Sequence, residues 1–211
     1  MTKATPENYI AEARKAIKNQ VLQRALADLQ NRFGRGTAES YQRLPEGPDL
    51  RLKAHEIRMQ TVENLDVVLE TLAANIRKNG GQVFFAEDGQ AAVNYCLEVA
   101  QRHKVGRVVK GKSMVSEEIG LNDALINSGI DVSETDLGEY IIQLAGETPS
   151  HIIAPAIHKT RDDVGSLFAD KLDIPYETDP PRLTWIARKA LREKFLAADL
   201  GTSGCNIACA E

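Results

Sequence analysis

The sequence predicts an α/β fold in which a layered sheet is flanked by helices and preceded by a helical amino-terminal arm. Two observations support this prediction. Apolar residues recur at helical spacing through the first 80 residues. From Gln82 onward, short runs of β-branched or aromatic residues alternate with helical stretches, which is typical of a layered α/β sheet. We therefore predict a helical arm over residues 1–80 and an α/β domain over residues 81–211.

The arm is predicted to hold two long amphipathic helices. The first covers Glu7 to Phe33 and should end where Gly34 and Gly36 interrupt the apolar pattern. The next segment, Leu44 to Pro48, is rich in helix breakers and is predicted to be a loop. The second helix carries an apolar stripe from Leu50 to Ile76. Such an arm can pack on its own domain or on a partner.

The α/β domain is predicted from short apolar runs and helix signals. Runs that fit strands are Val83–Ala86, Val105–Lys110, Ile130–Val132 and His151–Pro155, and a further strand should begin after Gly204. Helices are expected from a cap at Asp88 to about His103, over Val115–Asn127, after a capping box at Thr160, and from Asp179–Pro180 to Phe195. The apolar run Tyr140–Leu144 fits either type of element.

Composition excludes several classes of protein. The formal net charge of -4 argues against a general nucleic-acid binder, which needs clustered Lys and Arg to replace phosphate counterions. A small anionic ligand in a local basic pocket stays open. The polar amino terminus does not resemble a secretory signal, and no apolar run approaches the roughly 18 residues of a spanning helix. We expect a cytoplasmic location and no membrane span.

The three cysteines are too few for an iron–sulfur cluster or a four-cysteine zinc site. On a strand, Cys205 and Cys209 would lie about 13 Å apart on one face, which is too far to bond or chelate together. We interpret both, and Cys96, as small core residues. No metal site is predicted in this chain.

Residues Gly106–Ser113 match the P-loop pattern G-x-x-x-x-G-K-[ST], which would indicate a nucleotide hydrolase. The context disagrees, because a P-loop needs a flexible loop between its glycines, whereas Arg107–Val109 is itself predicted to be strand. A milder interpretation places Lys110 and Lys112 at the strand end, with Ser113 capping the next helix. These groups could then converge on a carboxylate or phosphate, or the lysines could simply be solvated.

Acidic residues and one histidine extend this candidate binding site. Glu134, Asp136 and Glu139 cluster near a glycine and could pair with the lysines, bind a cation or move protons, or form a solvated acidic loop. His158 lies between a predicted strand and a helix, from where an imidazole can reach a cleft. The candidate ligand-binding set is therefore Lys110, Lys112, Ser113, Asp136, Glu139 and His158. No catalytic residue is assigned.

Three long blocks resemble the LutB-type lactate-utilisation iron–sulfur proteins: VKGKSMVSEEIGLN at 109–122, ETDLGEYIIQL at 134–144 and PSHIIAPAIHK at 149–159. The likeness extends to the arm and to residues 204–211. It implies a LUD domain, with a fold similar to that of sugar-isomerase and CoA-transferase-like domains. The family commonly has a serine where Gly111 stands, so the P-loop pattern is interpreted as a coincidence of one substitution.

The resemblance also implies a role in oxidising L-lactate to pyruvate together with sister subunits. In the family, cysteines that bind 4Fe–4S clusters follow in a ferredoxin-like carboxy-terminal region, so the α/β domain is expected to be incomplete at its carboxyl end. By this hypothesis the chain binds a small anion or docks partner subunits and is not catalytic alone. The alternatives are a non-catalytic assembly scaffold and, less favoured, a P-loop nucleotide-binding protein.

Overall fold

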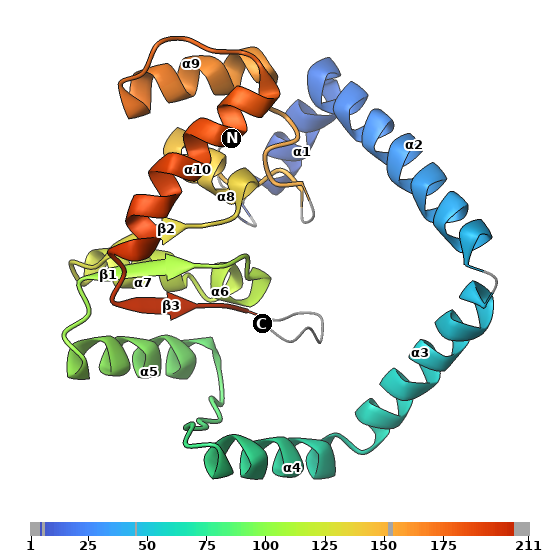
Figure 1. Ribbon diagram of the computed structural model, residues 1–211, viewed down its shortest axis with the longest axis vertical. Coiled ribbons are helices and arrows are strands. Elements are labelled where there is room, and N and C mark those ends of the chain that lie inside the picture. Colours follow the sequence, from blue (N-terminus) through green and yellow to red (C-terminus); the bar gives the residue numbers. More distant parts are fainter. Residues whose placement is uncertain (1–4, 6, 45, 152–153, 205–211) are drawn as a thin grey trace. The chain divides into compact units, whose positions relative to one another are not determined.

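The computed structural model describes residues 5, 7–44, 46–151 and 154–204. The chain forms two compact units, one made of Met1–Ala25 with Ala86–Glu211 and the other of Leu26–Phe85. Helices flank a small parallel sheet (Figure 1), which confirms the predicted α/β class. Packing units do not by themselves define domains, so the boundary placed at residue 80 stays a prediction.

The sheet has three parallel strands in the order β2-β1-β3. They are β1 (Arg107–Lys110), β2 (Asp131–Glu134) and β3 (Leu200–Thr202). The arrows of all three point the same way in Figure 1. Lys110 is in register with Glu134 on one side and with Thr202 on the other. The carboxyl ends of the three strands therefore meet at one edge, which is where open α/β sheets bind ligands.

Two of the predicted strands are confirmed and others differ. The segments at 105–110 and 130–132 correspond to β1 and β2. The strand predicted over Val83–Ala86 is wrong: the segment is irregular, Phe84 and Phe85 are exposed, and none of the strands in the described part of the chain pairs with it. In the predicted strand His151–Pro155, the described residues lie in bends and turns. The predicted strand after Gly204, with both of its cysteines, lies outside the described residues.

Six helices of the described chain follow the arm and surround the sheet. They are α5 (Gly89–Arg102), α6 (Met114–Glu118), α7 (Leu121–Asn127), α8 (Leu137–Ala145), α9 (Arg161–Leu172) and α10 (Pro180–Leu196). The caps predicted at Asp88, Thr160 and Asp179 are confirmed, and Thr160 forms the full capping box. The single helix expected over 115–127 is instead split, because Gly120 adopts a left-handed conformation with φ 69°.

Two apolar clusters hold these helices in place. One joins α5 and α7 to the sheet through Val93, Leu125, Val108 and Val132. The other joins α8, α9 and α10 through Tyr140, Phe168, Leu183 and Ala187. Val108 and Lys110 share a face of β1 because side chains alternate along a strand, so the first cluster leads directly to Lys110 at the strand end.

The arm consists of α1 (Tyr9–Lys18), α2 (Gln20–Arg43), α3 (Gly47–Glu63) and α4 (Leu65–Lys78). The helix break predicted at Gly34 and Gly36 is wrong, because α2 continues through both. A glycine inside a helix lowers helix stability by only about 1 kcal/mol relative to alanine, so the surrounding sequence can keep the helix intact. The loop predicted over Leu44–Pro48 is also partly wrong, since Pro48 lies in the first turn of α3, where its missing N–H does no harm.

Candidate functional site

A buried ion pair joins the ends of β1 and β2. Lys110 Nζ lies 2.8 Å from Glu134 Oε1, and the two side chains are only 1% and 5% exposed. The contact follows from the register, because residues opposite each other in neighbouring strands point to the same face of the sheet. One strand ends in a buried Lys and the next in a buried Glu, so each charge neutralises the other.

Hydrogen bonds from α6 and α7 support this pair, although Glu134 Oε2 is buried without a hydrogen-bond partner among the described residues. Lys110 Nζ donates to Ser116 Oγ at 3.1 Å, and Asn122 Nδ2 donates to Glu134 Oε1 at 2.7 Å. The ammonium group of Lys110 is therefore surrounded by groups of its own fold. Lys110 does not line the cavity described next.

That cavity, of about 280 Å³, lies beside the carboxyl end of β1. Its lining includes Lys112, Glu117, Glu139, Ser150 and His151. Lys112 Nζ donates to Glu139 Oε1 at 3.1 Å, and the Lys112 side chain is 31% exposed whereas that of Glu139 is 5% exposed. Glu139 thus holds the ammonium group of a side chain that is about one third exposed.

Glu117 also lines the cavity, and the fold changes the pKa of its carboxyl group. Burial of part of the carboxyl raises its pKa, and the negative charge of Glu139 raises it further. The positive charges of Lys110 and Lys112 act in the opposite direction without reversing the shift. Glu117 can therefore donate a hydrogen bond more readily than an ordinary glutamic acid.

Two predicted site residues, Ser113 and Asp136, act as helix caps. Ser113 Oγ accepts from the N–H of Ser116 at 3.1 Å and so begins α6. Asp136 Oδ1 accepts from the N–H groups of Gly138 and Glu139, at 3.0 and 3.3 Å, and so begins α8. The first cap directly follows Lys112 and the second holds the turn that carries Glu139, so both caps position the walls of the cavity.

His158 belongs to a chain of polar contacts that reaches the cavity. Its Nδ1 lies 2.7 Å from Ser150 Oγ, and its Nε2 lies 2.7 Å from Glu147 Oε2. Lys159 Nζ donates to the other oxygen of Glu147. Ser150 lines the cavity, so His158 is linked to the cavity through its contact with Ser150. Of the predicted site residues, Lys112 and Glu139 therefore line the cavity themselves, and His158 is linked to it through Ser150.

Sequence reasoning missed Glu117, Glu147, Ser150 and His151 as members of this region. Ser150 and His151 lie in the block that carries the family resemblance, so that block contained a usable signal. Glu147 follows a helix end in the sequence, and nothing in its pattern indicates an interaction with a histidine eleven residues later.

Glu147 makes stability sensitive to acid. Burial alone would raise its pKa, but hydrogen bonds from Lys159 and His158 outweigh burial and hold the pKa well below its usual range. A lowered folded-state pKa adds stability that is present above the unfolded value and is lost as pH falls through the folded one.

The folded-state pKa of Glu147 is about 2, so we expect wild type to lose its stability advantage over Glu147→Gln progressively between about pH 5 and about pH 2. Chemical denaturation of both proteins at several pH values checks this. The interpretation fails if the stability difference between the two proteins is independent of pH across that range.

The P-loop pattern does not have P-loop geometry. Residues Arg107–Lys110, which should form a phosphate-binding loop between the two glycines, form β1 instead. The helix after Ser113 has five residues. The pattern is therefore formed by a strand and a helix cap, and it gives no support to nucleotide hydrolysis.

Among the described residues, no group of three or more His, Cys, Asp or Glu side chains is placed to hold a metal ion. No helix among those residues is both long and apolar enough to cross a membrane. Within the same part of the chain, Cys96 is the one cysteine, and burial raises the pKa of its thiol. One thiol does not fit the four-thiolate ligand set of a 4Fe–4S cluster.

Comparison with known proteins gave consistent results. The sequence profile of the LUD domain matches residues 69–211. The chain is 43% identical over 204 residues to "Lactate utilization protein B" of Oceanobacillus iheyensis and 42% identical over 198 residues to the protein of that name in Lysinibacillus sphaericus. It is 39% identical over 209 residues to "Uncharacterized electron transport protein YkgF" of Escherichia coli.

These alignments cover 97%, 93% and 99% of this chain but only 43%, 42% and 44% of the three relatives, respectively. The chain thus spans about two fifths of the length of the curated relatives it matches. No solved structure matches the chain. The implied likeness to sugar-isomerase and CoA-transferase-like domains therefore stays a prediction.

Proposed function

Because the chain belongs to the LUD domain family, we propose that it is the LUD portion of a lactate-utilisation electron-transfer protein and binds a small carboxylate in the cavity beside Lys112. Two of the relatives carry lactate utilisation in their names, and a third is called an electron transport protein. Sister subunits of a lactate-oxidation system and a cytoplasmic location are part of the proposal.

The observation that supports ligand binding is the partly exposed side chain of Lys112 in the lining of a small cavity at the carboxyl edge of the sheet. Ser150 and His151 add polar side chains to the lining of the cavity. The raised pKa of Glu117 favours its neutral form, which repels a bound carboxylate less than the charged form does. With one lysine against Glu117, Glu118 and Glu139, the lining favours a singly charged carboxylate over a doubly charged phosphate.

The redox centres are proposed to lie elsewhere. The described residues do not fit a 4Fe–4S cluster, so no electron-transfer step is assigned to them. We propose that such clusters are bound by polypeptide outside the described residues. Iron and acid-labile sulfide analysis of this chain tests that, since stoichiometric iron in it would contradict the proposal.

We expect L-lactate or pyruvate to bind the chain weakly and Lys112→Met to reduce that affinity at least about tenfold. The substitution removes the accessible charge and keeps most of the volume of the side chain, and a charge-assisted hydrogen bond accounts for an effect of that size. Isothermal titration calorimetry with each carboxylate measures it, with circular dichroism to show that the variant is folded.

The matched control is Lys171→Met, which removes an exposed lysine of α9 that pairs with its neighbour Asp170 away from the cavity lining. Its affinity should equal that of wild type. Unchanged binding in Lys112→Met, or no binding by wild type at high millimolar ligand, would remove the ligand-binding part of the proposal. The scaffold interpretation would then be favoured.

A further inference from the structure

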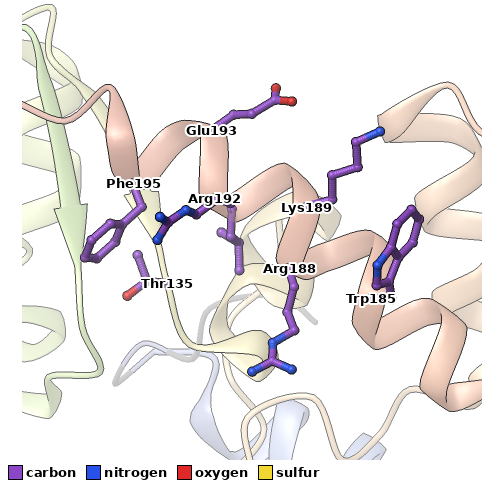
Figure 2. Close-up of a pocket in the computed structure, with 8 residues that line it drawn as sticks. Thr135, Trp185, Arg188, Lys189, Arg192, Glu193 and Phe195 are labelled. Atoms are coloured by element: carbon purple, nitrogen blue, oxygen red, sulfur yellow. The ribbon is translucent and has the colours of Figure 1, made fainter.

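The outward face of α10 is an open basic and aromatic surface. A shallow cavity of about 800 Å³ runs along this helix, and Figure 2 shows side chains projecting from it. Trp185 is 64% exposed and Phe195 is 56% exposed. Trp and Arg are among the residues most enriched at the energetic centres of protein interfaces. We call Trp185, Arg188, Arg192 and Phe195 the α10 stripe.

Spacing and charge define what this surface can bind. The members of the α10 stripe are three, four and three residues apart, which places them along one side of a helix. No described carboxylate forms an ion pair with Arg188 or Arg192. Lys189 adds a third cation beside the Trp185 ring, 5.8 Å from its centre, against Glu193 as the one acid of the lining. The surface is therefore locally basic on a chain of net charge -4.

This geometry favours a helix of another polypeptide over a small molecule. Small-molecule sites are concave and enclose most of their ligand. Here the aromatic rings project from a helix and remain more than half exposed. A straight stripe of about three turns matches an amphipathic helix lying along it, with acidic groups to meet the two arginines.

The chain itself carries a helix of this kind. Along α4, Leu65, Leu69 and Leu72 are exposed and share one face. Asp66 and Glu70 lie one turn apart beside that face, and no described cation pairs with either of them. Apolar side chains with two adjacent carboxylates are complementary to aromatic side chains with two adjacent guanidinium groups.

We propose that two copies of this chain associate, with α4 of each copy lying on the α10 stripe of the other. Because every copy carries both surfaces, a two-fold pair makes the contact twice. Arg188 and Arg192 would meet the carboxylates of Asp66 and Glu70, while Trp185 and Phe195 would cover the apolar face of α4. The proposal is independent of the carboxylate site, whose lining residues differ from those of this surface.

Charge reversal provides the test. Sedimentation equilibrium should show a dimer for wild type. The α10 variant Arg188→Glu/Arg192→Glu and the α4 variant Asp66→Arg/Glu70→Arg should each be monomeric at the same concentration, with a dimerisation Kd at least about tenfold weaker. Mixed in equal amounts, the two variants should form a heterodimer, because both of its contacts again join opposite charges.

Trp185 provides a second measurement, since it is the only tryptophan in the sequence. Its emission should shift to shorter wavelength when the two variants are mixed, as the ring leaves water. A control reversal at an exposed lysine of α9, Lys171→Glu, should leave the dimer intact. A monomeric wild type, a dimer unaffected by either reversal, or two variants that stay monomeric on mixing would each overturn the proposal.

Discussion

Lys110→Ala should lower the free energy of unfolding by about 3–5 kcal/mol, because it leaves the buried carboxylate of Glu134 without its counter-charge. The lysine is 1% exposed, so solvent cannot replace its ammonium group unless the strand end opens. Urea denaturation of both proteins measures this loss.

A double variant separates the buried charge from simple loss of packing. In Lys110→Met/Glu134→Leu both charged groups are replaced by apolar side chains of similar size, and we expect most of the lost stability to return. Equal stability of Lys110→Ala and wild type would show that the ion pair is not the source of stability at this strand end.

Gly165→Ala should also be severely destabilising, by about 3 kcal/mol or more. A Cβ at this position of α9 would lie 2.1 Å from the carbonyl oxygen of Glu177. That oxygen belongs to the backbone of the segment leading into α10, so it cannot rotate away as a side chain could. Phe168, fully buried one turn further along α9, depends on the same close approach.

Gly36→Ala is the matched control, because the same substitution there meets no atom within 4 Å. Gly36 lies inside α2, where alanine is the better helix former, so a gain of about 0.5–1 kcal/mol is expected. Thermal unfolding of the two variants should move in opposite directions. A stable Gly165→Ala would mean that α9 and the Glu177 segment can separate without loss.

Local signals made much of the fold predictable. The caps at Asp88, Thr160 and Asp179 depend on residues within three positions of one another, and the structure has all three. The incorrect predictions concern segments whose structure depends on residues distant in the sequence. Val83–Ala86 has the composition of a strand but pairs with none of the three described strands, whereas Leu200–Thr202 becomes a strand because β1 offers it a free edge.

The candidate site was predictable in part for a similar reason. Lys110 and Lys112 were correctly expected at a strand end, since strand and cap signals are local. Which of them faces the cavity depends on the register with Glu134, and register is a property of two strands. The contact of His158 with Glu147 joins a helix end to a turn, so a reading of either segment alone could not find it.

Because β1 pairs on one side with Leu200–Thr202, about ninety residues later in the chain, its free edge stays open for much of biosynthesis. During translation at roughly 5–20 residues per second, β1 and β2 can pair several seconds before that third strand leaves the ribosome. The nascent chain would then expose the unpaired backbone of Val108 to Lys110, a template for intermolecular aggregation. A nascent chain that stalls before Leu200 should therefore depend on chaperones far more than the full-length product.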